Sequence, residues 1–116
     1  MLIFKIFRAD EWAVLRRDGK SIGAPIDVAD GYIHFSTALQ ASETAAKHFA
    51  GVDDLFLIAV DAEAAGGDLK WELSRNNDHF PHLYREITLQ DVVWAQPLPL
   101  ENGQHQFPAG LDEASR

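Results

Sequence analysis

The chain has 116 residues, of which ten are basic and eighteen acidic, so its formal charge is −8, and it contains no cysteine. This length fits a single domain, and the lack of cysteine excludes a disulfide framework, a thiolate nucleophile and a cysteine zinc site. The negative charge argues against a nucleic-acid-binding module, because it repels phosphate backbones at long range. The apolar start is too short for a signal peptide, and no apolar run reaches the roughly 20 residues that span a bilayer. We therefore expect a cytoplasmic protein that makes no membrane contact.

Residues 2–7 are mostly apolar and predict a first strand. Residues 10–17 predict a helix, because acidic side chains come first, arginines come last and Gly19 follows as a typical end signal. Residues 20–30 contain glycine and proline and have no hydrophobic period, so they predict a long loop. Long loops in small domains are often part of binding sites.

Residues 31–36 predict a short strand with two different faces. One face carries Tyr32, His34 and Ser36, and the apolar face opposite should anchor the strand to the core. A strand that is polar on one side can also simply face water, and that alternative stays open. A phenol, an imidazole and a hydroxyl on one face can orient a polar ligand. Thr37 follows at the start of the next segment, where hydroxyls and backbone N–H groups can hold an anion.

Residues 42–50 predict a second helix that is capped by Ser42. His48 falls on the apolar side of this helix, so we expect it to be buried with a hydrogen-bond partner rather than to bind a ligand. Residues 55–60 are apolar on both faces, which is typical of a central strand covered on both sides. Residues 61–68 are rich in glycine and alanine and predict a second loop.

Residues Leu69–Leu73 alternate in polarity and predict a further strand. Two interpretations of the charges around Trp71 remain open. In the first, Trp71 is part of the core and the charges are solvated. In the second, Glu72 and Arg75 lie on a pocket rim, where the carboxylate accepts hydrogen bonds from sugar hydroxyls and the guanidinium binds an anion.

Residues 76–81 are rich in turn formers, and Pro81 argues against a regular central strand there. His79 and His82 lie three residues apart, a spacing that shares one face only on a helix, and Pro81 stands between them. No acidic third ligand has a recognised spacing, so we expect no metal site.

Residues 92–100 predict a last strand, whose prolines suggest a sheet edge, and residues 110–116 predict a frayed tail after a structured core of about residues 2–108. Several short strands with two short helices, in no βαβ order, indicate an α+β fold in a single domain covering residues 1–116.

Four segments occur in an order and spacing that resemble a known bacterial family, the domain of unknown function 952. They are residues 31–37, 43–51, 69–72 and 80–84. The resemblance covers roughly residues 4–100 and implies the fold of ADP-ribosyltransferases, a small split antiparallel sheet around a cleft that holds NAD. NAD is then a substrate, and no obligatory cofactor is implied.

In such enzymes a histidine or arginine on an early strand contacts the ribose of NAD, a hydroxyl residue follows, and an aromatic ring stacks on nicotinamide. The resemblance gives the first two roles to His34 and Ser36. It gives the stacking role to Trp71 or Tyr84.

A late glutamate aligns the ribose and the acceptor in those enzymes, and neither Glu86 nor Glu101 matches its pattern. His82 is the candidate for a comparable place. Cleaving the bond between nicotinamide and ribose builds positive charge on the sugar, so a carboxylate is needed there, and Glu72 or Glu86 is available. The candidate catalytic residues are therefore His34, Glu72 and His82. The candidate ligand-binding residues are Tyr32, Ser36, Thr37, Trp71, Arg75 and Tyr84.

The leading interpretation is a domain that binds NAD, ADP-ribose or a related nucleotide and transfers ADP-ribose or a phosphate group from it. The alternative is a non-catalytic module that binds a small molecule or a partner and keeps the cleft without the chemistry. A third hypothesis, a metal-dependent hydrolase that uses His34, His79 and His82, predicts bound zinc or iron. The sequence makes no prediction of oligomeric state.

Overall fold

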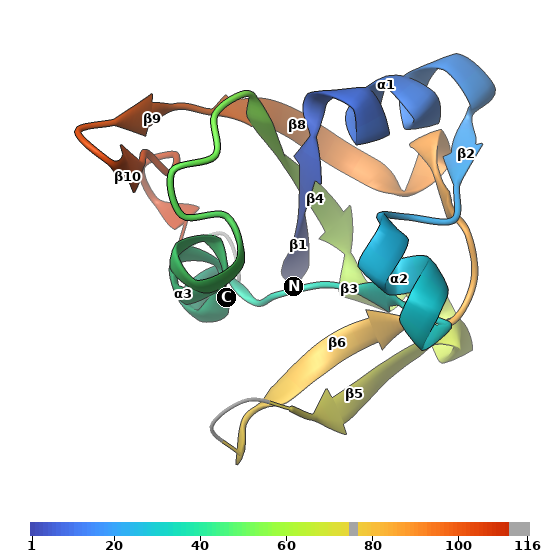
Figure 1. Ribbon diagram of the computed structural model, residues 1–116. Helices are drawn as coiled ribbons and strands as arrows, with labels where there is room; N and C mark the ends of the chain where they lie inside the picture. Colours follow the sequence, from blue (N-terminus) through green and yellow to red (C-terminus); the bar gives the residue numbers. More distant parts are fainter. Residues whose placement is uncertain (75–76, 112–116) are drawn as a thin grey trace.

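The computed structural model describes residues 1–74 and 77–111 and has an α+β fold with several antiparallel sheets and few helices (Figure 1). The helices are α1 (Ala9–Asp18), α2 (Pro25–Asp30), α3 (Ala38–His48) and α4 (Ala62–Ala65), with 3₁₀ turns at Gly66–Asp68 and Leu89–Asp91. The strands are β1 (Leu2–Arg8), β2 (Lys20–Ser21), β3 (Ile33–His34), β4 (Leu55–Asp61), β5 (Leu69–Leu73), β6 (His79–Leu83), β7 (Ile87–Thr88), β8 (Val92–Leu98), β9 (Leu100–Glu101) and β10 (Gln104–His105).

The first sheet has the order β1-β4-β8 and is antiparallel throughout. Its middle strand, β4, sends alternate side chains into two separate apolar clusters, so both faces are covered, as the sequence predicted. Helix α1 contributes Leu15 to one cluster, and α3 contributes three alanines to the other. Strand β8 lies at the edge of this sheet, which agrees with the presence of Pro97 in it.

The second sheet has the order β3-β6-β5 and is tied to the first by an isolated bridge between Phe4 and Ser36. The backbone groups of these two residues exchange hydrogen bonds of 2.8 Å in both directions. Ile33 and Phe35 are buried in the cluster that also holds Leu83, so the prediction that this apolar face anchors the strand is confirmed. The polar face of β3 is thereby turned away from that cluster.

The predicted loop at residues 20–30 is wrong, because it contains β2 and the helix α2. Pro25 occupies the first turn of α2, where its missing N–H is no loss, and the carboxylate of Asp27 accepts a hydrogen bond from the N–H of Ala24. Gly31 then ends the helix in a left-handed conformation. The sequence shows no hydrophobic period here because the helix has only six residues.

Three other helix predictions also need correction. The loop at residues 61–68 contains α4, so the fold has four α-helices in its described residues rather than two. Helix α3 begins at Ala38 instead of near Ser42, because Thr37 is its cap. His48 ends that helix with an exposed side chain, so its predicted burial is wrong.

Pro81 lies in β6, the middle strand of the second sheet, although the sequence argued against a central strand there. Its carbonyl accepts a hydrogen bond of 2.9 Å from the N–H of Phe35, but proline has no N–H to donate in return. The sheet tolerates the proline because β3 ends at His34. Phe35, which lies opposite Pro81, is already outside the strand, so the missing N–H of Pro81 interrupts no hydrogen bond within β3.

The helices within residues 1–74 and 77–111 are too short or too polar to cross a bilayer. Two of the sequence predictions fall outside these ranges: the role of Arg75 and most of the frayed tail at residues 110–116.

Candidate functional site

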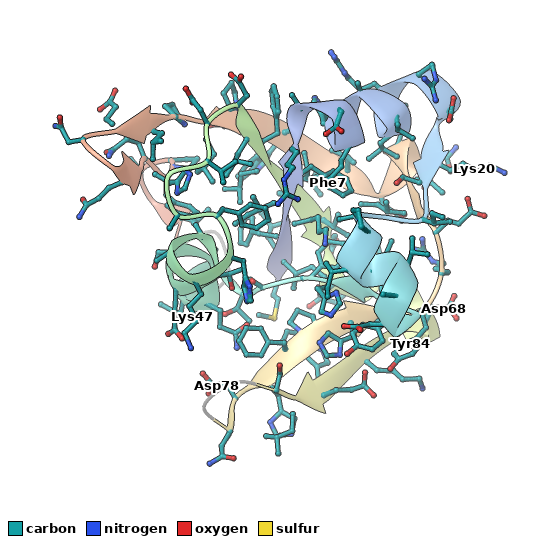
Figure 2. The ribbon with its side chains drawn as sticks, in the orientation of Figure 1. Phe7, Lys20, Lys47, Asp68, Asp78 and Tyr84 are labelled. Carbon is teal, nitrogen blue, oxygen red and sulfur yellow. The ribbon has the colours of Figure 1, made fainter. Side chains whose placement is uncertain are left out.

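A cavity of about 740 Å³ opens where the two sheets meet, and β1, α2, β3, α3 and β6 contribute to its walls. It is lined by His34, Ser36 and His82, three of the residues that the sequence singled out. The ring centroids of His34 and His82 are 5.5 Å apart, and the two residues are direct partners across β3 and β6. Figure 2 shows the side chains that surround this space between α2, α3 and β6. His34 and His82, which are far apart in the sequence, are therefore neighbours on one wall of the cavity and do not face each other across it.

The His34 ring is contacted by Asp27, a residue of α2 that is only 1% exposed. Oδ1 of Asp27 lies 2.6 Å from Nδ1 of His34 and accepts a hydrogen bond of 3.0 Å from the His34 backbone N–H. The same carboxylate forms an ion pair with Lys5 of β1, whose Nζ lies 2.7 Å from Oδ2. Lys5, Asp27 and His34 thus form a chain of polar contacts in which the buried Asp27 links two residues of the cavity wall, Lys5 and His34.

The charges in this chain stabilise each other. Burial alone would raise the pKa of Asp27, but the hydrogen bond from His34 and the charge of Lys5 outweigh it and lower the pKa to about 2. Burial lowers the pKa of Lys5 from its ordinary value, and the neighbouring Asp27 opposes that effect. Asp27 is therefore a carboxylate at neutral pH, which suits it to orient the ring of His34.

Gly23 makes room for this buried carboxylate. Its φ is +96°, a conformation that favours glycine, and a Cβ atom placed on it would overlap the side chain of Asp27. Gly23 is not among the residues that line the cavity, so it supports His34 only through Asp27.

Asp30 approaches the other nitrogen of the His34 ring. Its Oδ2 lies 2.9 Å from Nε2 of His34, and Asp30 is on the cavity wall. His34 is therefore held between two carboxylates of the same short helix, α2.

The His82 ring is oriented by a different carboxylate. Its Nδ1 lies 2.9 Å from Oε1 of Glu72, and the hydroxyl of Tyr84 donates a 2.6 Å hydrogen bond to the same oxygen. The hydrogen bonds from Tyr84 and His82 lower the pKa of Glu72, and the carboxylate raises the pKa of Tyr84 to about 12. When Nδ1 donates to Glu72, Nε2 of a neutral His82 ring is left as a hydrogen-bond acceptor. Glu72 does not line the cavity and acts on it through His82.

Tyr32 packs behind both histidines. Its ring stacks on His82 at a centroid distance of 4.2 Å and lies 4.7 Å from the ring of His34. Tyr84 lies 5.1 Å from Tyr32 on the far side. Neither tyrosine lines the large cavity; both border a smaller pocket of about 280 Å³. The two tyrosines therefore support the histidine rings from behind.

The two hydroxyl residues after His34 are used differently. Ser36 is buried and lies on the cavity wall, with its Oγ 2.9 Å from Oγ1 of Thr44. Thr37 does not line the cavity, since its Oγ1 accepts a hydrogen bond from the N–H of Gln40 and caps α3. The open alternative that this strand simply faces water is not what the structure shows, because His34 and Ser36 both border the cavity.

Trp71 is not brought to the cavity. It alternates with Glu72 along β5 and so projects from the opposite face, where it is 41% exposed. The interpretation of Trp71 as a core residue is therefore wrong. His79 is exposed on β6 and, three positions from His82, also lies on the opposite face. In the described part of the chain, no three metal-ligating side chains gather into a metal site.

Sequence reasoning missed Lys5, Asp27 and Asp30, and it named Glu72 and Glu86 as the available carboxylates. Glu86 borders the smaller pocket instead. The carboxylates on the wall of the large cavity are Asp10, Glu11 and Asp30. A usable signal for the missed residues was Lys5, a lone charge inside an otherwise apolar strand.

The fold and the cavity therefore define a small α+β protein with a pair of carboxylate-oriented histidines. A family model described as "Protein of unknown function (DUF952)" matches residues 6–95, and the chain belongs to this family.

The chain is also similar to solved structures of protein CC0527 from Caulobacter crescentus. The crystal structure is 45% identical in sequence with a TM-score of 0.91, and the match covers 96% of this chain and 98% of that one. A double mutant of the same protein gives the same values. The solution NMR structure is 44% identical with a TM-score of 0.81, covering 97% of this chain and 95% of that one. A comparison with curated proteins found no match.

Proposed function

We propose that this chain binds NAD, ADP-ribose or a related nucleotide in the large cavity and has an ADP-ribosyltransferase-like fold. The observation that carries the proposal is the convergence of His34, Ser36 and His82 on one cavity of about 740 Å³. That volume lies within the range of roughly 300–1,000 Å³ that is usual for cofactor and small-molecule sites. The two three-stranded sheets joined at one bridge also suit the split sheet that the family resemblance implies.

The polar groups of the cavity match the parts of such a ligand. A ribose hydroxyl can bond to the ring of His34 and to the hydroxyl of Ser36. Arg8 also lines the cavity, and its guanidinium, which pairs with Glu11 at 3.5 Å, brings positive charge for a diphosphate. Asp27 already orients the ring of His34, so the ligand has only to take the place of Asp30 at Nε2.

Group transfer from NAD would break the bond between nicotinamide and ribose, with the electron pair leaving on nicotinamide and an acceptor oxygen or nitrogen bonding to the ribose. Asp30 is the carboxylate nearest to His34 on the cavity wall and would face the positive charge that develops on the sugar. The acceptor's proton would pass to Nε2 of His82, the nitrogen that Glu72 leaves as an acceptor.

One observation favours the second candidate, a non-catalytic binding module. Glu72, the carboxylate that the sequence named for catalysis, lies behind His82 and not on the cavity wall. In that case the nucleotide binds and nicotinamide is not released.

The experiment measures the melting temperature of the chain with millimolar NAD and, separately, with millimolar ADP-ribose. A ligand at 100 times its Kd adds about 2.7 kcal/mol, which raises Tm by several degrees. We expect His34→Ala and His82→Ala to remove the rise, whereas His79→Ala, a matched change on the other face of β6, keeps it. The absence of a rise with both ligands contradicts the proposal, and an assay of released nicotinamide separates the transferase from the binding module.

A further inference from the structure

Strand β5 forms an open edge of the second sheet. It is last in the order β3-β6-β5, and Figure 1 shows it on the outside of the molecule with β6 between it and the rest. No strand pairs with its outer side in the part of the chain that the structure describes. An open edge presents backbone N–H and C=O groups that can pair with another strand.

The register shows which backbone groups of β5 point outward. The carbonyl of Pro81 bonds to Phe35 of β3, so the backbone groups of Pro81 point away from β5. Trp71, which stands opposite Pro81, is therefore in a pair without hydrogen bonds to β6, and its own N–H and C=O point to the open side. By the alternation of antiparallel strands, Leu69 and Leu73 point their groups the same way.

The side chains on this edge are unusually apolar for an exposed strand. Trp71 is 41% exposed and Leu73 is 59% exposed, and both project from the same face. Lys70 and Glu72 project from the other face, next to one another on the strand. A partner that covers β5 must therefore offer apolar groups on one face and opposite charges on the other.

A second copy of β5 meets both of these requirements. It reads Leu-Lys-Trp-Glu-Leu, so in an antiparallel pair of two copies centred on Trp71, each leucine faces a leucine and each lysine faces a glutamate. The two Trp71 residues exchange both hydrogen bonds, and the N–H of Leu73 donates to the carbonyl of Leu69 in the other copy. The N–H of Leu69 is not needed, since it already bonds to Gly66.

The neighbouring registers are disfavoured by charge. A pair centred on Lys70 would place the two lysines directly opposite each other, and a pair centred on Glu72 would do the same with the glutamates. In the register centred on Trp71, Lys70 and Glu72 fall at positions without backbone hydrogen bonds, where opposing side chains come closest. The charge pattern therefore selects one register.

We propose that a second copy of this chain pairs with the open edge of β5 in a two-fold symmetric dimer. The same strand is used by both copies, which is the commonest kind of symmetric interface. The two sheets join into one continuous antiparallel sheet across the axis. Pairing covers Trp71 and Leu73 and closes an edge that would otherwise be open to unspecific association.

The test measures mass by analytical ultracentrifugation over a range of concentrations that extends to high micromolar. We expect a monomer–dimer equilibrium for the natural chain. Lys70→Glu puts two acidic side chains opposite each other at both ends of the pair and weakens dimerisation by about tenfold or more. Lys47→Glu has the same change of charge on an exposed face of α3 and leaves the equilibrium unchanged.

A charge exchange guards against the effects of misfolding. Glu72→Lys also weakens self-association, but it additionally removes the contacts of Glu72 with His82 and Tyr84. A mixture of the Lys70→Glu and Glu72→Lys chains has opposite charges at both positions, so we expect it to form a mixed dimer although neither chain pairs well alone. A monomer at every concentration, a dimer that Lys70→Glu leaves intact, or a mixture that does not associate would each overturn the proposal.

Discussion

The two histidines of the cavity are both oriented by a carboxylate, but in opposite surroundings. Asp27, which contacts His34, is buried and forms an ion pair with the buried Lys5. Glu72, beside His82, is half exposed on a hairpin and accepts a hydrogen bond from the hydroxyl of Tyr84. The first pair is built into the junction of helix and sheet, whereas the second lies on the outer strands β5 and β6.

The difference indicates that the two carboxylates contribute differently to the stability of the fold. A buried ion pair that loses one partner leaves an uncompensated charge in the interior, which is costly. An exposed carboxylate that is lost is replaced by water at little cost. Changes around His34 should therefore alter stability together with the proposed nucleotide binding, and changes around His82 should alter the proposed binding with little change in stability.

The largest effect is expected from Lys5→Met. It leaves Asp27 buried without its cation and should lower the free energy of unfolding by about 3–5 kcal/mol. Urea unfolding at neutral pH measures the loss. Lys20→Met is the matched control, because Lys20 is exposed, and its effect should be close to zero. Equal losses for the two variants would show that the buried ion pair does not contribute more to stability than an exposed lysine does.

The next effect is a dependence of stability on acid pH. The pKa of Asp27 is about 2 in the folded chain and about 3.9 in an unfolded one, so the carboxylate stabilises the fold above about pH 4. This contribution, about 2–3 kcal/mol, is lost progressively as the pH falls from about 5 to below 2.

Urea unfolding in steps from pH 6 to acid conditions measures this dependence for the natural chain, Asp27→Asn and Glu72→Gln. The stability advantage of the natural chain over Asp27→Asn should shrink with falling pH. Its advantage over Glu72→Gln should change much less, since that carboxylate is half exposed. An advantage over Asp27→Asn that stays constant with pH contradicts the low pKa of Asp27.

The smallest effect concerns the second pair alone. Glu72→Gln removes the carboxylate that raises the pKa of Tyr84 to about 12, so this pKa should fall towards 10 with little change in Tm. Ultraviolet titration of the tyrosines follows it, and the chain has only two, Tyr32 and Tyr84. In Tyr84→Phe, Tyr32 is the one tyrosine that remains, so this variant shows which of the two titration steps belongs to which tyrosine. A Tyr84 titration that is the same with and without Glu72 is the contrary result.

Local patterns in the sequence predicted much of the fold. The apolar runs gave β1 and β4, and the end signals at Gly19 gave α1. The errors arose where tertiary contacts decide. Helix α2 is too short to have a period, and it is held in place by the contacts of Asp27 with Lys5 and His34. Pro81 was excluded from a central strand because the sequence does not reveal that β3 stops beside it.

The candidate site was predicted in part. The alternation along residues 31–36 gave the shared face of His34 and Ser36, and the family resemblance added His82. The partners of the two rings were harder to find. Lys5 and Asp27 are 22 positions apart, and no local rule joins a lone lysine in a strand to an aspartate in an unrecognised helix. Trp71 was selected by residue type, although the face of the strand on which it lies decides its contacts.

The positive φ at Gly23 has a consequence for protein engineering. Because any side chain there collides with Asp27, the histidine at the cavity depends on a residue that does not line the cavity. A designer who grafts the two histidines onto another scaffold must transfer this glycine as well. If the cavity binds a nucleotide as proposed, random mutagenesis that selects for loss of binding should recover substitutions at position 23, outside the cavity wall.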